Sequence, residues 1–381
     1  GELIGFCSAW GYWLCAVIAN VSYLVIVFSA LSFFTDTPEL RLFGDGNTWQ
    51  SIVGASALLW IVHFLILRGV QTAASINLVA TLAKLLPLGL FVVLAMMMFK
   101  LDTFKLDFTG LALGVPVWEQ VKNTMLITLW VFIGVEGAVV VSARARNKRD
   151  VGKATLLAVL SALGVYLLVT LLSLGVVARP ELAEIRNPSM AGLMVEMMGP
   201  WGEIIIAAGL IVSVCGAYLS WTIMAAEVPF LAATHKAFPR IFARQNAQAA
   251  PSASLWLTNI CVQICLVLIW LTGSDYNTLL TIASEMILVP YFLVGAFLLK
   301  IATRPLHKAV GVGACIYGLW LLYASGPMHL LLSVVLYAPG LLVFLYARKT
   351  HTHDNVLNRQ EMVLIGMLLI ASVPATWMLV G

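Results

Sequence analysis

Charged residues are scarce in this sequence. Lys, Arg, Asp and Glu together make up 10% of its 381 residues, whereas hydrophobic residues make up 61%. A soluble domain carries about 25% charged and about 45–50% apolar residues. So few charges cannot cover a soluble protein of this size with polar surface. Because long uncharged apolar runs recur from end to end, we predict an all-α polytopic membrane protein.

Sequence signatures of enzymes and metal sites are also missing. The chain contains no Walker loop, no His-Glu-x-x-His, no nucleophile elbow and no Cys-x-x-Cys pair. Its six cysteines all fall within apolar runs, where a cysteine behaves as a small buried hydrophobe. We therefore predict no enzyme activity, no cofactor and no metal site. The net charge of +4 gives no reason to expect a nucleic-acid partner.

Eleven apolar runs approach or exceed the length of about 20 residues that crosses a bilayer as a helix. We expect membrane spans at residues 4–33, 48–67, 73–99, 119–142, 153–178, 200–232, 252–272, 276–299, 309–325, 328–347 and 361–380.

Basic residues are divided unevenly between the alternate loops. One set of loops holds 15 of the 22 Lys and Arg, the other holds six, and Lys84 lies within a span. Cytoplasmic loops carry an excess of Lys and Arg, so the richer set is predicted to be cytoplasmic, together with the amino end. In that set, we expect residues 235–250 to form a short basic helix along the membrane surface.

Ionisable side chains inside spans are the first candidates for function, because each costs about 2.5–3.5 kcal/mol to insert. Lys84 and Glu285 both lie deep in their spans. A buried Lys84 must lose its proton or find carbonyl and carboxylate partners, so it can stand in for a coupling cation. The alternative is a lysine that extends to the interface. Glu285 can pair with Lys84 or relay protons, and the sequence does not decide between these roles.

Glu136 lies mid-span between Gly134 and Gly137. This spacing permits the helix to unwind, which frees backbone carbonyls for a cation such as an α-ammonium group. The carboxylate can attract a basic substrate or hold a proton. The alternative is a glycine-mediated helix contact with a protonated, hydrogen-bonded Glu136.

Two tryptophans lie near the middle of their spans. Trp130 precedes Glu136 by roughly one and a half helical turns, and Trp221 lies in the sixth span. An indole face attracts a guanidinium or ammonium group by about 2 kcal/mol when both are desolvated. The alternative for each is a tryptophan that faces lipid or the protein core.

Several motifs together resemble one transporter family. They are Leu129-Trp130-Val131-Phe132-Ile133-Gly134-Val135-Glu136, Trp10-Gly11-Tyr12-Trp13 with Asn20, Phe238-Pro239-Arg240-Ile241-Phe242-Ala243-Arg244 followed by Asn246 and Pro251, and Val289-Pro290-Tyr291. With these motifs, nearly the whole chain resembles the amino acid–polyamine–organocation superfamily. It is similar to the bacterial basic amino acid/polyamine antiporters, and most closely to the arginine/ornithine antiporters.

The resemblance implies a LeuT-type fold in a bacterial inner membrane, with two inverted repeats of five helices and substrate bound between them. Residues 1–381 would then form a single transporter domain that corresponds to helices three to thirteen of the family. The first two helices, with the glycine-rich break that binds the substrate α-carboxylate, are expected to be absent from this chain.

The resemblance also assigns roles to individual residues. The expected substrate contacts are Trp130 by stacking, Ile133 through its backbone, Asn20, Trp221 and Ser284. A serine that some members use for the guanidinium falls at Ala283, which is why Ser284 is named. The expected cytoplasmic gate comprises Tyr12, Glu136 and Tyr291. Lys84 would occupy the place of a sodium ion, with Glu285 as a second proton or cation site.

The function implied by the resemblance is exchange of basic amino acids by alternating access, arginine entering and ornithine leaving. The expected partners are a basic amino acid or its amine product and membrane lipid, and the resemblance also allows a homodimer. The alternatives are lysine/cadaverine exchange, ornithine/putrescine exchange, and a membrane fragment that does not transport.

Overall fold

The computed structural model describes residues 1–69, 85–140, 142, 147–185, 187–351 and 357–380. Throughout these ranges the regular structure is helical. The long elements are α1 (Glu2–Thr35), α2 (Trp49–Leu67), α4 (Leu85–Met98), α9 (Lys148–Val176), α12 (Pro200–Thr234), α13 (Ser252–Thr272), α14 (Tyr276–Ile301), α15 (Pro305–Ser325), α16 (Pro327–His351) and α17 (Arg359–Val380). The short elements are α5 (Leu101–Lys105), η1 (Leu111–Leu113), α6 (Val117–Asn123), α7 (Met125–Phe132), α8 (Gly137–Val140), α10 (Arg179–Glu184), α11 (Ser189–Met198) and η3 (Arg240–Ala243).

Eight helices in the described ranges are long and apolar enough to cross a membrane. The span expected at 119–142 is instead divided into α6, α7 and α8. Only the second part of the span expected at 73–99, helix α4, lies within the described residues. Lys84 lies outside them. The prediction of an all-α polytopic membrane protein is confirmed.

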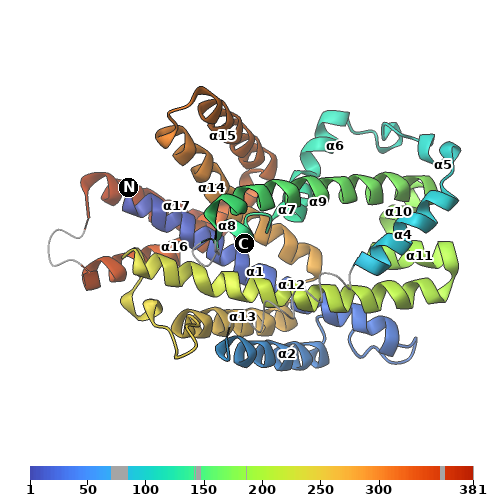
Figure 1. Ribbon diagram of the computed structural model, residues 1–381, viewed down its shortest axis with the longest axis horizontal. Helices are drawn as coiled ribbons and strands as arrows, with labels where there is room; N and C mark the ends of the chain where they lie inside the picture. The colour runs from blue at the N-terminus through green and yellow to red at the C-terminus, as the bar shows by residue number, and fades with distance from the viewer. Residues whose placement is uncertain (70–84, 141, 143–146, 186, 352–356, 381) are drawn as a thin grey trace.

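Helix α1 lies at the centre of the bundle. After Glu2 it carries no charged residue, and 78% of its most apolar stretch of 18 residues is buried. It packs mainly against α12 and α14, and Figure 1 shows it running beside α12 along the long axis of the molecule. A helix that is apolar on every side suits this central position, because no face needs to meet water or lipid headgroups.

Polar side chains connect α1, α12 and α13 inside this apolar environment. The Trp13 indole N–H donates to Thr258 Oγ1 at 3.1 Å, and the Thr258 hydroxyl donates to the Ala225 carbonyl at 3.3 Å. Helices in a bilayer gain little from hydrophobic burial against one another, so interhelical hydrogen bonds and close packing hold them together. These bonds therefore fix the core on which the site is built.

The short basic helix expected at residues 235–250 is wrong. The segment contains only the 3-10 turn η3, and the rest is irregular. Lys236 has a φ of 65°, which ends the α-helical path just after α12. Pro239 then disfavours a helical conformation at the residue before it. The basic side chains are therefore carried by a loop.

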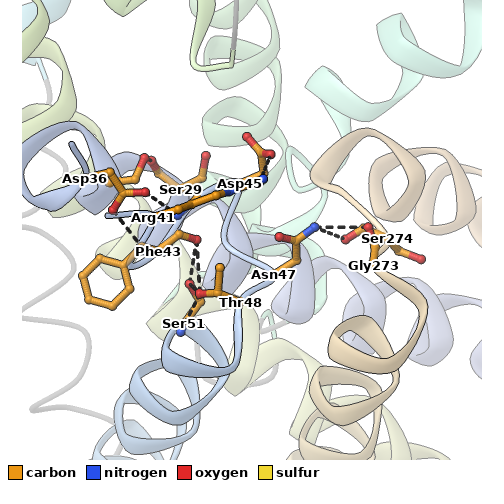
Figure 2. A network of polar contacts seen from close by, with 12 residues as sticks. Ser29, Asp36, Arg41, Phe43, Asp45, Asn47, Thr48, Ser51, Gly273 and Ser274 are labelled. Carbon is orange, nitrogen blue, oxygen red and sulfur yellow. Dashed lines mark hydrogen bonds and ion pairs between the residues drawn. The ribbon is translucent and has the colours of Figure 1, made fainter. Parts of the chain in front are cut away.

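The loop between α1 and α2 is held by its own polar groups (Figure 2). Asp36 accepts hydrogen bonds from the N–H groups of Phe43 at 3.0 Å and Gly44 at 2.8 Å. Burial alone would raise the pKa of Asp36, but these bonds outweigh it and lower that pKa below its ordinary value. Asn47 donates to the Gly273 carbonyl at 3.1 Å, which ties the loop to the connection between α13 and α14.

Candidate functional site

The helix that carries Glu136 is broken at its centre. Helix α7 ends at Phe132, and α8 begins at Gly137. Ile133 adopts an extended conformation with a ψ of 128°, and Gly134 has a φ of 109°. Only glycine adopts such a positive φ without steric cost, so the break depends on Gly134. The unwinding that the glycine spacing predicted is confirmed, and it turns the Ile133 carbonyl out of the helical ladder.

Helix α12 packs directly against this break. A Cβ atom on Gly134 would lie 3.1 Å from Cζ2 of Trp221, and one on Gly137 would lie 2.8 Å from Sδ of Met224. Both glycines therefore allow the unwound backbone to approach the side chains of α12 more closely than any other residue would. The backbone of the break and the Trp221 indole are therefore in direct contact.

Glu136 accepts hydrogen bonds from three different parts of the chain. The Tyr12 hydroxyl of α1 donates to Oε1 at 3.1 Å, and the Tyr291 hydroxyl of α14 donates to Oε2 at 3.1 Å. The Gly134 N–H donates to Oε2 at 2.9 Å. One carboxylate thus connects α1, α14 and the break itself. The structure brings together the three residues that the resemblance assigned to a gate.

Aromatic rings gather beside the break. The Tyr23 ring centroid lies 6.2 Å from that of Trp130 and 6.4 Å from that of Trp221, both within the range of favourable ring contacts. Ile133 and Trp130 pack against the cluster of buried residues that contains Trp221. Sequence reasoning missed Tyr23, although it lies three residues after Asn20 and so on the same face of α1.

Two buried polar side chains near the site have unused hydrogen-bonding capacity. Asn20 on α1 and Ser284 on α14 are both fully buried. Neither the amide atoms of Asn20 nor the Ser284 hydroxyl has a hydrogen-bond partner among the described residues. An unsatisfied buried polar group costs about 1–3 kcal/mol, so both side chains gain stability when a polar ligand supplies the missing bonds.

Glu285 follows Ser284 on α14 and is 1% exposed. Its expected partner, Lys84, lies outside the described residues, so the pairing stays a prediction.

These features define a membrane transporter in which an unwound helix, a carboxylate and an aromatic cluster meet at the centre of a helical bundle. The amino acid permease family model matches residues 1–369. The chain therefore belongs to the amino acid permease family. The superfamily predicted from the sequence motifs is confirmed, as are the multi-pass inner-membrane location and the prediction that the protein is not an enzyme.

Three curated relatives illustrate the similarity. The chain is 44% identical to an arginine/ornithine antiporter of Pseudomonas aeruginosa over 368 residues, which cover 91% of this chain and 75% of the relative. It is 41% identical to an arginine/agmatine antiporter of Chlamydia caviae over 373 residues, covering 93% and 76% of the two chains. It is 38% identical to a putative amino-acid transporter of Clostridium perfringens over 391 residues, covering 97% and 80%.

Proposed function

We propose that this protein exchanges basic amino acids across the bacterial inner membrane by alternating access, with arginine as the imported substrate. The observation that carries the proposal is the Glu136 carboxylate at a helix break, bonded to two tyrosines from other helices. The arginine/ornithine and arginine/agmatine relatives share arginine and differ in the exchanged product. This favours arginine over lysine, and ornithine is the first counter-substrate to test.

The substrate would lie beside the break and the Trp221 indole of α12. Its α-amino group would bind the Ile133 carbonyl, which the extended backbone turns away from the helix. Its guanidinium would stack on Trp130 and reach Trp221, since desolvated cation–π contacts are favourable. Asn20 and Ser284 would complete their hydrogen bonding with the polar groups of the substrate, so a substrate without such groups would bind less well.

Tyr12, Glu136 and Tyr291 would form the cytoplasmic gate. A bond between α1 and the break, and another between the break and α14, close the space among these three elements. Release of substrate to the cytoplasm then requires both tyrosine hydroxyls to leave the carboxylate. Substrate binding would drive this change only by interacting more strongly with the open-gate state than with the closed one.

Exchange by this route needs no ion gradient when the empty carrier reorients slowly. We propose that Lys84 provides the positive charge that a sodium ion would supply, with Glu285 as its partner or as a proton relay. We also propose that the spans form a LeuT-type pair of inverted repeats within a single transporter domain.

The test is uptake of radiolabelled arginine into proteoliposomes that contain the full-length protein. Separate preparations are preloaded with ornithine, agmatine, cadaverine, putrescine, or buffer alone. We expect rapid uptake against ornithine and little uptake into unloaded vesicles, because exchange requires a counter-substrate. Equal uptake with and without a preloaded substrate would contradict exchange. Uptake of lysine against cadaverine but not of arginine would move the protein to the lysine/cadaverine class.

A further inference from the structure

Helix α14 carries a proline directly beside the gate. Pro290 precedes Tyr291, whose hydroxyl donates to Glu136. Proline has no N–H, so Pro290 cannot donate to the carbonyl of Met286 four residues earlier, as any other residue of the helix would. Met286 is fully buried, so water does not readily replace the missing bond. Pro290 thus leaves a backbone acceptor in the core without its helical donor.

The Met286 carbonyl faces Gly11 of α1. A Cβ atom on Gly11 would lie 2.8 Å from the Met286 carbonyl oxygen, and it would overlap the hydroxyl of Tyr337 from α16. Gly11 directly precedes Tyr12, the other tyrosine bonded to Glu136. Three helices therefore meet at one backbone position: α1 carries the gate tyrosine Tyr12 beside it, and α14 carries the gate tyrosine Tyr291 directly after Pro290.

The Tyr337 hydroxyl is a buried donor without an acceptor. Tyr337 is 6% exposed, and its hydroxyl makes no hydrogen bond within the part of the chain that the structure describes. Burying a hydroxyl in this condition costs free energy that a phenylalanine would not incur. An unused donor and an acceptor deprived of its helical partner thus converge on Gly11. A small displacement of α14 along α1 would let them pair.

Nearby contacts fix the position of α16 relative to α1. The Trp10 indole N–H donates to the Leu336 carbonyl at 3.1 Å. Gly340 lies flat against the Trp10 indole, since a Cβ atom there would lie 2.6 Å from its Cε2. Pro339, directly before Gly340, interrupts the hydrogen-bond ladder of α16 and so leaves carbonyl groups of that helix available to partners from other helices. These contacts hold Tyr337 of α16 close to α1.

We propose that Tyr337 is a positioning residue of the gate: its hydroxyl donates to the Met286 carbonyl in the open-gate state. In the closed state Tyr12 and Tyr291 bond to Glu136, and Tyr337 has no acceptor. In the open state Tyr12 and Tyr291 leave Glu136, and the new bond between the Tyr337 hydroxyl and the Met286 carbonyl offsets part of the free energy of the two lost bonds. The inference rests on the gating function proposed above, because it concerns which gate state is stabilised.

The test compares Tyr337→Phe with Tyr346→Phe, a matched control on the same helix at a residue 60% exposed. Tyr337→Phe removes only the hydroxyl, so it should lower the maximal rate of arginine/ornithine exchange by about 3- to 10-fold, as expected for one neutral hydrogen bond. The KM for external arginine should stay constant or fall, because the closed, externally binding state becomes more populated. Tyr346→Phe should exchange like the parent protein.

Three further variants, Gly11→Ala, Tyr337→Leu and their combination, probe the shared position. Gly11→Ala places a methyl group where the Tyr337 hydroxyl lies and should slow exchange strongly. Gly11→Ala combined with Tyr337→Leu should recover part of that loss, since leucine lacks the ring and hydroxyl that collide with the methyl group. Recovery above the product of the two single effects supports direct contact. A double variant no faster than Gly11→Ala would overturn that contact.

An unchanged maximal rate for Tyr337→Phe would overturn the inference, as would a raised KM for external arginine. Trp130→Leu and Glu136→Gln in the same vesicles separate this failure from that of the proposed function. If those two variants lose exchange while Tyr337→Phe does not, only the role of Tyr337 fails. If they retain exchange, the assigned site fails independently of Tyr337.

Discussion

The Tyr12 hydroxyl donates to Glu136 Oε1 at 3.1 Å, although the two residues lie 124 positions apart in the chain. Tyr291 occupies the other carboxylate oxygen. The gate is therefore held by a single side chain, because the Glu136 carboxylate accepts hydrogen bonds from both tyrosines. Its disruption should therefore affect transport more than it affects folding.

Replacing Glu136 with Gln should reduce exchange strongly. An amide presents one acceptor oxygen in place of two, so at least one tyrosine loses its partner. Hydrogen bonds to charged groups contribute about 1.5–3 kcal/mol, so the closed, externally binding state would lose about 10- to 150-fold in population relative to the open state, and exchange would fall because external arginine binds less often. The measurement is the initial rate of arginine/ornithine exchange in proteoliposomes. Glu184→Gln, at an exposed position on α10, is the control and should match the parent protein. Normal exchange by Glu136→Gln would rule out the gate.

Replacing Trp130 with Leu should weaken substrate binding. A lost cation–π contact of about 2 kcal/mol raises the dissociation constant about 30-fold. Trp130→Phe should retain part of the affinity, since phenylalanine keeps a ring face. Competition binding of arginine to the purified protein measures the effect. Trp270→Leu, at a residue 51% exposed, serves as the control. Equal affinities for both leucine variants would place the substrate elsewhere.

Replacing Gly134 with Ala should damage the helix break itself. An L-residue with a left-handed backbone conformation costs about 1–2 kcal/mol, and the new methyl group would press against Trp221. We expect the rate of exchange to fall on the order of tenfold, because the backbone of the break would no longer hold the geometry that binds the substrate. Gly313→Ala on α15 meets nothing within 4 Å and should be neutral. If both alanine variants behave alike, the break is not required for transport.

Replacing Asp36 with Asn should loosen the loop between α1 and α2 in a pH-dependent way. Because the folded-state pKa of Asp36 is lowered, its stabilisation is complete above the ordinary carboxyl pKa of about 3.9. It is lost as the pH falls through the folded-state pKa. Hydrogen exchange at the Phe43 and Gly44 amides should accelerate in Asp36→Asn at pH 6. Unchanged exchange at both amides would show that the carboxylate does not hold the loop.

His63 and Asn259 should couple in a double-mutant cycle. Both are fully buried, and His63 Nδ1 lies 2.9 Å from Asn259 Nδ2. Either single change to Leu leaves the other side chain unsatisfied, at a cost of about 1–3 kcal/mol, whereas changing both should be nearly neutral. Thermal unfolding in detergent measures the four variants. Additive losses in the double variant would show that the two side chains are independent.

Local patterns in the sequence predicted much of the fold and part of the site. Apolar run lengths predicted the eight spanning helices of the described residues, because crossing a bilayer imposes a minimum length on each helix, but not the division of residues 119–142. The glycines around Glu136 predicted the break, because glycine alone adopts the backbone conformation of Gly134. The helix expected at 235–250 was wrong, since Pro239 and the positive φ of Lys236 outweighed the charge pattern.

The remaining features depend on contacts between distant segments. Tyr23 lies in an apolar run like many other aromatic residues. Its spacing from Asn20 places it on the same face of α1, but its contacts with Trp130 and Trp221 are what assign it to the site. The convergence of Tyr337 with Met286 at Gly11 joins three helices whose packing no local pattern specifies. His63 carries no neighbouring signal that points to Asn259, which lies 196 residues away.

The polar loop between α1 and α2 has a practical consequence for imaging. Asp36 holds its backbone from within, and Asn47 fastens it to the connection between α13 and α14. An antibody fragment raised against this loop would meet a surface whose shape is set by its own hydrogen bonds (Figure 2). Such a fragment would add mass and an alignment marker for single-particle microscopy.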